Sequence, residues 1–514
     1  MRAGTIQLLL PDGLTASAAA DALAGELPIV TQRAHTLERT FWDTFDGRIH
    51  HAGLALVDGG RRLALTDALT YAEEVGAAHD GAAQRLLATD LAAGALRDRL
   101  APLIEMRALT PIARVRSRML PVNVLDELGK IVVRLRVEEP LALGGGAAKL
   151  SLRPRLHVTG VLGYDADYDR VLALLTGQLG LVEARRPVHD DAVEAVGGSA
   201  GGTSSKLRVE LRPGMRADVA AVAVLRRLHE VIVANLPGTL AGVDSEFLHD
   251  LRVAVRRSRA MQRELAGVFP PEPLRVFRDG FKELQSVTGP VRDLDVQLLE
   301  FDDLAAGLPE RDDVAPLRRL LEAQLESERK KMVRALRSTR TRGLLDNWRV
   351  FLDELVEADE AERPDAARPV QDVAGERIDR VYRRMVKMGR AIDDDSPAEA
   401  LHELRKKGKE LRYLLEFFAP LYPAEVVKPM VATLKALQDV LGRFQDREVQ
   451  ANVLRAMGDE VAALEGGAAA LMAMGVLIQR LGGEQAQARA EFAASFAEFA
   501  AKRQRKVVAK TFAP

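Results

Sequence analysis

The feature that most constrains the fold of this chain is an internal repeat with a spacing of 153 residues. His249-Asp250-Leu251-Arg252 recurs as His402-Glu403-Leu404-Arg405, and 402 minus 249 gives that spacing. The same offset relates further pairs: Arg256 to Lys409, Arg259 to Arg412, Lys282 to Lys435, Leu284-Gln285 to Leu437-Gln438, Gly289 to Gly442 and Asp293 to Asp446. Chance does not keep one register over so many polar identities, so this region is interpreted as a duplication.

The duplicated region is predicted to be helical throughout. Over residues 214–510 the chain consists of long amphipathic segments rich in Leu, Ala, Arg and Glu, which are good helix formers. One amphipathic hairpin cannot bury its own apolar stripe. Each half, 214–359 and 369–510, is therefore predicted to form a bundle of about four helices.

Residues 1–190 have a different composition. Short β-prone runs such as Lys130–Val137 and Leu150–Val158 alternate with turns and a few helical stretches, which predicts an α+β domain. The small residues of Gly197–Ser205 are typical of a flexible connection, and a linker is predicted over 191–213. The fold class is therefore multidomain, with an α+β domain followed by an all-α domain.

Composition and charge exclude several classes of site. Lys and Arg number 73 against 74 Asp and Glu, so bulk charge does not hold the chain to nucleic acid or membrane, and any polyanion site must be local. The chain has no cysteine, which excludes disulfides, thiolate zinc sites and cysteine nucleophiles. We see no secretory signal pattern, and the longest apolar stretch, Ala468–Ile478, is too short to span a bilayer. We expect a cytoplasmic protein without a membrane span.

Three of the predicted helices carry stripes of basic side chains. At about 100° per residue, five residues of the first repeat fall within an arc of about 80°: His249, Arg252, Arg256, Arg259 and Arg263. Leu248, Leu251, Val255 and Ser258 point away from this arc. The second repeat offers His402, Arg405, Lys409 and Arg412, with Lys406 next in sequence and with Leu401, Leu404, Leu411 and Leu415 behind them. A third predicted helix carries basic residues at the same spacings: Arg377, Arg380, Arg384 and Lys387.

These stripes contain no acidic residue, although solvated helix faces usually interleave both signs because like charges repel. An acid-free stripe made twice in one register indicates an anionic ligand. Arg suits phosphate, since its planar fork donates two hydrogen bonds. Single-strand binders usually offer aromatic platforms, but aromatic residues are 4% of the chain and only Tyr413 lies beside a stripe. We therefore predict a base-free phosphate chain as the ligand, rather than nucleic acid.

The two repeated histidines are not predicted to bind a metal. Neither His249 nor His402 lies in an HxxxH or HExxH spacing, and no cysteine is present to complete a site. A hydrogen bond to phosphate or to the neighbouring bundle is the favoured interpretation for both.

The helical region resembles a known family. The segments HDLRVAVRRSR and HELRKKGKELRY, the Leu-Gln-x-x-x-Gly turns and the aspartates after them are similar to the CHAD domain, which is built of two such halves. The resemblance implies a basic groove or pore between two four-helix bundles, binding of inorganic polyphosphate and, in some members, association with polyphosphate or polyhydroxyalkanoate granules. Position by position, it implies contacts at His249, Arg252, Arg256, Arg259, Lys282, His402, Arg405, Lys409, Arg412 and Lys435. Asp293 and Asp446 are expected to cap helices or to pair with Arg.

The N-terminal domain resembles the CYTH or triphosphate-tunnel family, an antiparallel tunnel-like barrel. The likeness rests on residues 35–57, HTLERTFWDTFDGRIHHAGLALV, and on LTPIARVRSRMLPVNVLDELGKIVVRLRVEEP and YDADYDRVLALL. Enzymes of that family open with an ExExK strand that binds a divalent metal and triphosphate. Here the strand reads Thr5-Ile6-Gln7-Leu8-Leu9-Leu10, without a carboxylate, and Val57 stands where an arginine is expected. A degenerate, non-catalytic domain is therefore expected.

A basic set remains in this domain, and its alternation would place several of its side chains inside a barrel: Arg107, Arg114, Arg116, Arg118, Arg134 and Arg136. Asp126 and Glu138 remain as candidate metal ligands. Two interpretations stay open for the set, namely anion binding and pairing with acids around a disused barrel.

The leading prediction is a non-catalytic polyphosphate-binding protein that uses neither a cofactor nor a metal. One alternative is a CYTH-type, metal-dependent inorganic triphosphatase. The other is a structural protein of granule surfaces.

Overall fold

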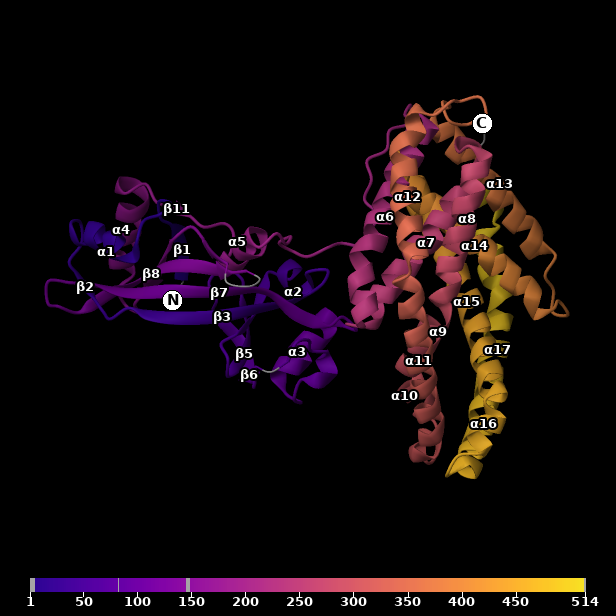
Figure 1. Cartoon of the computed structure of the whole chain (residues 1–514), viewed down its shortest axis with the longest axis horizontal. Helices are drawn as coiled ribbons and strands as arrows, with labels where there is room; N and C mark the ends of the chain where they lie inside the picture. The colour runs from indigo at the N-terminus through magenta and orange to yellow at the C-terminus, as the bar shows by residue number, and fades with distance from the viewer. Residues whose placement is uncertain (1–4, 82, 145–147, 513–514) are drawn as a thin grey trace. The chain divides into compact units, whose positions relative to one another are not determined.

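The computed structural model describes residues 5–81, 83–144 and 148–512. It divides into two compact units, Met1–Ser205 and Lys206–Pro514 (Figure 1). The predicted end of the first domain at residue 190 falls inside helix α5 (Val188–Ala195), which packs its Ala192 against Phe41 of unit 1. No helix in the described part of the chain is long and apolar enough to cross a membrane.

Unit 1 is built on one antiparallel sheet, which confirms the predicted sheet domain. Its strand path is β11-β1-β10-β8-β7-β3-β4-β5-β6, with β2 paired to β7 and β9 paired to β8. The strands are β1 Thr5–Leu9, β2 Ile29–Thr31, β3 His35–Thr44, β4 Leu54–Asp58, β5 Arg62–Asp67, β6 Glu73–Ala78, β7 Leu109–Leu125, β8 Ile131–Leu143, β9 Lys149–Ser151, β10 Arg155–Gly160 and β11 Val182–Glu183. The helical segments before α5 are α1 Ala16–Ala24, α2 Arg48–His51, η1 Ala88–Asp90, α3 Ala95–Ile104, α4 Asp165–Ala173 and η2 Leu174–Gln178.

Strand β7 shows which face of this sheet is the core. Val115 and Met119 are buried, whereas Arg114 and Arg118 are exposed, because successive side chains of a strand point to opposite faces. In β8, Arg134 and Arg136 are exposed in the same way. The prediction that the alternation turns these arginines inward is therefore wrong, since the apolar residues between them take the inner face.

Unit 2 is all-α, as predicted, and its helices are labelled in Figure 1. Their bounds are α6 Ala217–Ala241, α7 Ser245–Glu264, η3 Ala266–Val268, α8 Pro271–Val287, α9 Gly289–Leu299, α10 Phe301–Ala305, η4 Arg311–Val314, α11 Ala315–Leu336, α12 Thr339–Glu354, η5 Leu355–Glu357, α13 Val370–Arg390, α14 Ala398–Phe418, η6 Ala419–Leu421, α15 Ala424–Ala456, α16 Gly458–Ala462, α17 Gly467–Phe499 and α18 Lys502–Phe512.

The helix starts of unit 2 follow the offset of the sequence repeat. Helices α6 and α13, α7 and α14, η3 and η6, and α8 and α15 each begin 153 residues apart, as 398 minus 245 shows for α14 and α7. The halves diverge after that point. Pro290 lies in the first turn of α9, where it lacks the N–H that would continue α8, whereas Arg443 at the same repeat position lets α15 run on. The predicted turn at Gly442 is therefore wrong, because Gly442 lies within α15.

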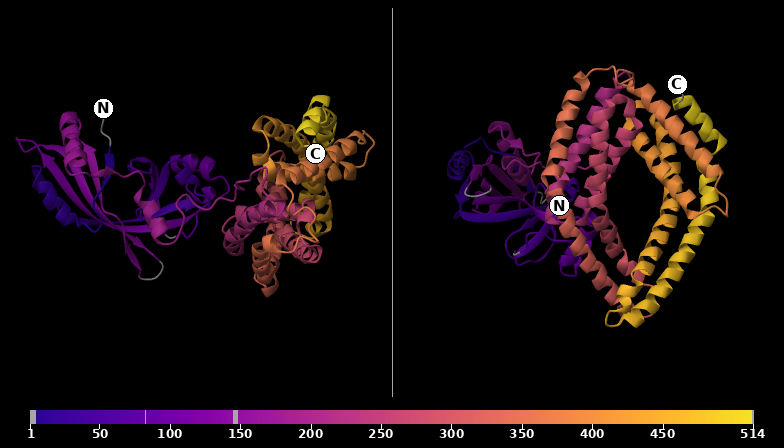
Figure 2. Two further views of the ribbon diagram at one scale, coloured as in Figure 1. Left: turned by 90° about the horizontal axis from the view of Figure 1, so that it is seen from above. Right: turned by 45° about the vertical axis from the view of Figure 1, so that its right-hand side comes forward.

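The two halves of unit 2 share their core. One continuous cluster of buried residues takes in Trp348 of the first half and Tyr382 of the second. A second cluster joins α9–α11 to α15–α17, with Leu317 and Met474 among its members, where these two arms of the unit meet (Figure 2). The apolar faces of both halves are thus buried against each other, and their polar faces are left to form sites.

Candidate anion-binding groove

A groove of about 570 Å³ lies among α7, α14 and α15 in unit 2. Helix α7 contributes His249, Val253, Arg256 and Arg257. Helix α14 contributes Arg405, Lys409, Arg412, Tyr413 and Glu416, and helix α15 contributes Gln438, Asp439, Gly442, Arg443 and Asp446. The predicted site residues that the structure brings together here are His249, Arg256, Arg405, Lys409 and Arg412.

Helix periodicity explains why α7 and α14 present these side chains to the groove. Leu248 and Leu251 of α7 and Leu404 and Leu411 of α14 are buried in the core, as predicted, so the basic residues between them point elsewhere. The start of α7 is fixed by its N-cap, because the Asp244 carboxylate accepts hydrogen bonds from the backbone N–H groups of the first turn at 2.9 and 3.1 Å.

The groove has an excess of positive charge. Six lining residues are Arg or Lys and three are Asp or Glu, which leaves three positive charges without a matching acid in the lining. Arg405 pairs with Asp446 at 3.0 Å, as was expected for that aspartate. Glu416 pairs with Arg257 at 2.5 Å and with Arg412 at 2.7 Å. The groove is therefore not acid-free, because acids absent from the basic stripes reach it from α15 and from the end of α14.

Two cations of the groove form no ion pair with any residue that the structure describes, and these are Arg256 and Lys409. The Arg256 Nε donates a hydrogen bond to the Tyr413 hydroxyl, and its guanidinium carbon lies 5.8 Å from the centre of that ring. Burial, together with the charges of Arg405 and Arg256, lowers the pKa of Lys409 to about 8. Both side chains are half-buried. A cation partly withdrawn from water without a counter-ion is unfavourable, and an anion in the groove would relieve that cost.

The one aromatic residue of the groove is not placed to stack a nucleotide base. Tyr413 is buried, with 8% of its surface exposed, and its ring stacks with Phe417 at 6.3 Å. Its hydroxyl is already bonded to Arg256. Tyr413 therefore orients a cation and offers no open platform.

Three cations of the first predicted stripe turn to other partners outside the groove lining. Arg252 donates to the Gln285 carbonyl and to the Thr288 hydroxyl, both at 2.9 Å. Arg259 donates to the Gln285 side-chain oxygen at 2.5 Å. Arg263 pairs with two acids, Glu264 at 2.7 Å and Glu410 at 3.0 Å. Both side chains are half-buried, and this burial lowers the pKa of Arg252 and of Arg259.

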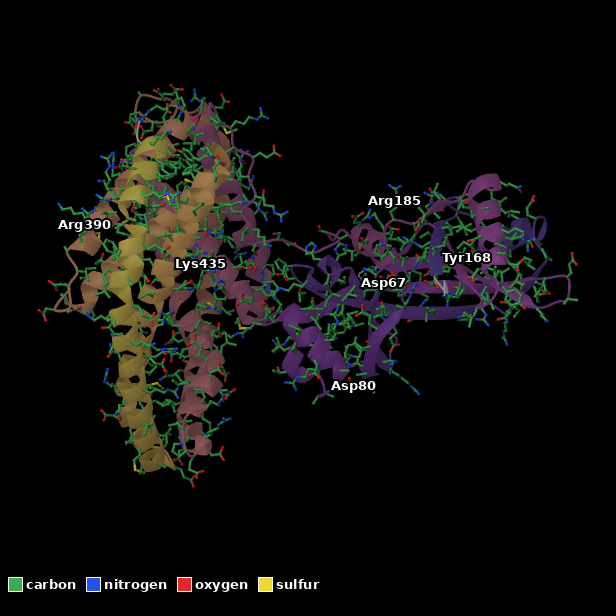
Figure 3. The ribbon with its side chains drawn as sticks, turned by 180° about the vertical axis from the view of Figure 1, so that it is seen from behind. Asp67, Asp80, Tyr168, Arg185, Arg390 and Lys435 are labelled. Carbon is green, nitrogen blue, oxygen red and sulfur yellow. The ribbon has the colours of Figure 1, made fainter. Side chains whose placement is uncertain are left out.

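The remaining predicted residues also lie outside the groove lining. Six of them are exposed: Lys282, Arg380, Arg384, Lys387, Lys406 and Lys435, the last labelled in Figure 3. Lys406 pairs with Glu403 at 2.6 Å. His402 is half-buried, and its Nδ1 is bonded to the Gln445 side chain.

His402 also belongs to a group with metal-ligand spacing. Potential ligand atoms of Glu399, His402 and Glu403 lie within 4.8 Å of one another on the first turns of α14. Glu399 is exposed, however, and Glu403 is already paired with Lys406. We assign no metal to this group.

Two cations of the groove, Arg257 and Arg443, were not predicted from the sequence repeat, because their repeat counterparts are not basic. The repeat counterpart of Arg257 is Glu410, and that of Arg443 is Pro290, so neither cation appeared in the paired positions. Both nevertheless line the groove. Each directly follows a repeat residue, Arg256 or Gly442, and so lies about 100° round the helix from it. Only the packing of α7, α14 and α15 shows that these two side chains face the same groove.

The interior of unit 1 holds a second polar cluster, centred on Glu138 of β8. This carboxylate is fully buried and accepts hydrogen bonds from Arg39, from the Ser117 hydroxyl at 2.6 Å and from His157 at 2.6 Å. Burial alone would raise the pKa of Glu138, but Arg39 and these hydrogen bonds hold it well below its usual range. Glu138 is therefore occupied by protein partners.

The other candidate ligand of unit 1 lies far from Glu138. Asp126 accepts hydrogen bonds from the backbone N–H groups of Leu128 and Lys130 at 2.9 and 2.8 Å, which shapes the turn between β7 and β8. Ile131, next to that turn, and Glu138 are seven residue steps apart on β8, which is about 23 Å along a strand. The two acids cannot share a metal ion.

Some arginines of the basic set in unit 1 lie beside acidic residues, and the others are exposed. Arg116 pairs with Glu38 at 2.5 Å and Arg118 with Glu139 at 3.2 Å. Arg107 is buried, and its Nε lies 3.9 Å from Asp46. For these three arginines the pairing interpretation is the one that the contacts favour.

Comparison with known proteins points to the helical unit. Residues 223–455 match the family model described as the CHAD domain. Among solved structures, the chain is similar to the CHAD domain from the plant Ricinus communis, with 24% identity, a TM-score of 0.49 and coverage of 57% of this chain and 96% of that chain. It is also similar to PptA from Streptomyces chartreusis, with 17% identity, a TM-score of 0.41 and coverage of 55% and 99%. No match was found among curated proteins.

Proposed function

We propose that the groove among α7, α14 and α15 binds inorganic polyphosphate. This groove lies within residues 223–455, which form a CHAD domain. That family is linked to polyphosphate binding in general. The binding is non-catalytic, and Arg256, Arg405, Lys409 and Arg412 supply its main contacts. Association with polyphosphate granules would follow from the same contacts.

The observation that carries this proposal is the pair of groove cations, Arg256 and Lys409, that form no ion pair with a described residue. Each lies beside further positive charge, and a fold gains nothing from holding like charges together. A chain of phosphates provides the missing negative charge at regular intervals. Arg256 and Arg412 offer planar forks that match phosphate oxygens, and Lys409 adds a compact charge in the same groove.

The groove also favours polyphosphate over nucleic acid. Non-specific single-strand binders gain much of their affinity from bases stacked on exposed aromatic rings. Tyr413 is the aromatic residue of the groove lining, and it is buried beneath Arg256. A nucleic acid would therefore gain only its phosphate contacts here and would also have to accommodate its bases.

The triphosphatase alternative gains no support from unit 1. Its candidate acids, Asp126 and Glu138, lie at different levels of the sheet, and Glu138 is engaged by Arg39 and His157. The strand β1, which would carry the metal-binding triplet, has Gln7 as its buried polar residue.

Polyphosphate affinity is expected to fall steeply with salt. If the four proposed cations each neutralise one phosphate, affinity should drop about 50-fold between 50 mM and 200 mM salt, by the counterion release measured for single strands. Titration of the purified full chain with polyphosphate at both salt concentrations checks this, with single-stranded DNA of equal charge as the reference ligand. Affinity that is insensitive to salt, or single-stranded DNA bound as tightly as polyphosphate, would contradict the proposal.

Polyphosphate affinity is also expected to fall as the pH rises from 7 to 9. The pKa of Lys409 is lowered to about 8. Its ammonium form, which binds phosphate, is therefore largely present at pH 7 and falls to about a tenth of the molecules at pH 9. A loss of affinity of up to about tenfold follows at constant ionic strength. The variant Lys409→Arg keeps its charge over this interval, so its affinity should show no such step. A step that persists in Lys409→Arg would assign the titration to another group.

A further inference from the structure

Lys409 is chemically unlike an ordinary surface lysine. It is the lysine of the groove lining, half-buried near the middle of α14. The charged groups that share the lining with it are Arg256 and Arg257 from α7, Arg405, Arg412 and Glu416 from α14, and Asp439, Arg443 and Asp446 from α15. Asp446 is held by Arg405 and Glu416 by Arg257 and Arg412, so two of the three acids of the lining have other partners.

We propose that Lys409 is a site of acylation by acyl phosphates, and that its acylation weakens the binding of polyphosphate. The inference rests on the proposed function, because it needs a groove that holds a phosphate group. An acyl phosphate carries both the phosphate that the arginines recognise and the carbonyl that an amine attacks.

The reaction is a transfer of the acyl group from phosphate to nitrogen. The lone pair of the neutral Lys409 Nζ attacks the carbonyl carbon, and the bond from that carbon to the phosphate oxygen breaks. Phosphate leaves with the bonding electron pair, the nitrogen releases one proton to solvent, and an amide remains. Arg256 and Arg412 can hold the leaving phosphate in their forks.

Two features of the groove promote this reaction. The guanidinium groups concentrate the phosphate-bearing reagent next to the amine. Burial and the neighbouring charges of Arg405 and Arg256 lower the pKa of Lys409 to about 8, so about half of its amine is neutral at pH 8. An ordinary lysine, with a pKa of about 10.4, has well under a hundredth of its amine neutral at that pH.

Acylation would also change the groove. The amide carries no charge, so the lining loses one of its three excess positive charges. The acyl group would take up space in the groove near Arg256 and Arg405, whose charges act on Lys409. Polyphosphate would then lose a contact and meet a bulkier side chain.

Acetyl phosphate and the full-length chain provide the test. The chain is incubated at pH 8, and the initial rate of acetylation is measured at each lysine by mass spectrometry of its peptides. Lys428, which is exposed on α15 and lies outside the groove lining, is the matched reference. Lys409 should react about tenfold faster than an ordinary lysine, since roughly a hundredfold more neutral amine is offset by its lower nucleophilicity, taken from the trend for thiols. Acetylation of Lys409 no faster than that of Lys428 would overturn the inference.

A reagent without phosphate separates the two features. The N-hydroxysuccinimide ester of acetate should still favour Lys409, but less than acetyl phosphate does. Inorganic phosphate should slow the reaction of acetyl phosphate at Lys409 while leaving that at Lys428 unchanged. An equal preference with both reagents, or no competition by phosphate, would overturn the role of the groove in holding the reagent.

Polyphosphate titrations before and after acetylation complete the test. The acetylated chain should bind polyphosphate about 30-fold more weakly than the untreated chain, in line with the loss of one charged hydrogen bond. Unchanged affinity at full acetylation of Lys409 would overturn the second part of the inference. If the untreated chain does not bind polyphosphate, the proposed function itself fails. If the untreated chain binds but Lys409 is not acetylated preferentially, only the acylation inference fails.

Discussion

The double variant Arg256→Glu plus Lys409→Glu is expected to bind polyphosphate about 1000-fold more weakly than the wild-type chain, because each lost charged hydrogen bond costs about 2 kcal/mol. The two substitutions change the charge of the lining by four, so an excess of three positive charges becomes an excess of one negative charge. The remaining pairs of Arg405 with Asp446 and of Arg412 with Glu416 would offer little net attraction. Binding is measured by titration at fixed salt.

The variant should keep its fold, because neither side chain belongs to the buried core of unit 2. Far-ultraviolet circular dichroism checks that helical content is unchanged. The matched control is Arg380→Glu plus Arg384→Glu, which makes the same change of charge on the exposed face of α13. Screening limits the reach of exposed charges to about 10 Å at 0.1 M salt, so this control should lose little affinity. An equal loss in the control would show that total charge, and not the groove, determines binding.

The variant Glu138→Gln is expected to destabilise unit 1 by about 3 to 5 kcal/mol, the usual cost of breaking a buried ion pair. Glu138 is fully buried, and its carboxylate is the charged partner of Arg39 inside the sheet. Removing its charge leaves the Arg39 guanidinium buried without a counter-ion. Unfolding in urea measures the effect. The chain has two tryptophans, so a background of Trp348→Phe leaves Trp42 as the reporter of unit 1.

The control for this prediction is Glu38→Gln. Glu38 also pairs with an arginine across the sheet, Arg116, but both side chains are close to half exposed. Exposed pairs contribute about 0 to 1 kcal/mol, so the control should change the free energy of unfolding by no more than that. A cost for Glu138→Gln as small as the control would mean that Arg39 finds another partner or water, and that the cluster around Glu138 is not an isolated ion pair.

The helical unit could be predicted well from the sequence because its main signals are local. The period of about 3.6 residues placed Leu248 and Leu251 of α7 in the core and the basic residues on the opposite face, which the structure confirms. The offset of 153 residues also appears in the helix starts. Periodicity does not reveal which neighbour a polar face meets. Arg252 and Arg259 therefore appeared equal to Arg256 in the sequence, although the structure turns them toward Gln285.

Contacts between the halves were out of reach for the same reason. Glu416 of the second half pairs with Arg257 of the first, and this pair depends on the packing of α14 against α7. In unit 1, the alternation along β7 and β8 was clear, but alternation alone does not say which face is buried. Val115 and Met119 decide that question by their burial, and they leave Arg114 and Arg118 outside.

The most direct test of the groove is a titration of labelled polyphosphate against three proteins side by side at one salt concentration, followed by fluorescence anisotropy. The proteins are the wild-type chain, the groove variant with Arg256→Glu and Lys409→Glu, and the α13 variant with Arg380→Glu and Arg384→Glu. We predict that the wild-type chain and the α13 variant bind alike, while the groove variant loses nearly all affinity. Binding by the groove variant that matches the wild-type chain, with loss in the α13 variant instead, would contradict the account.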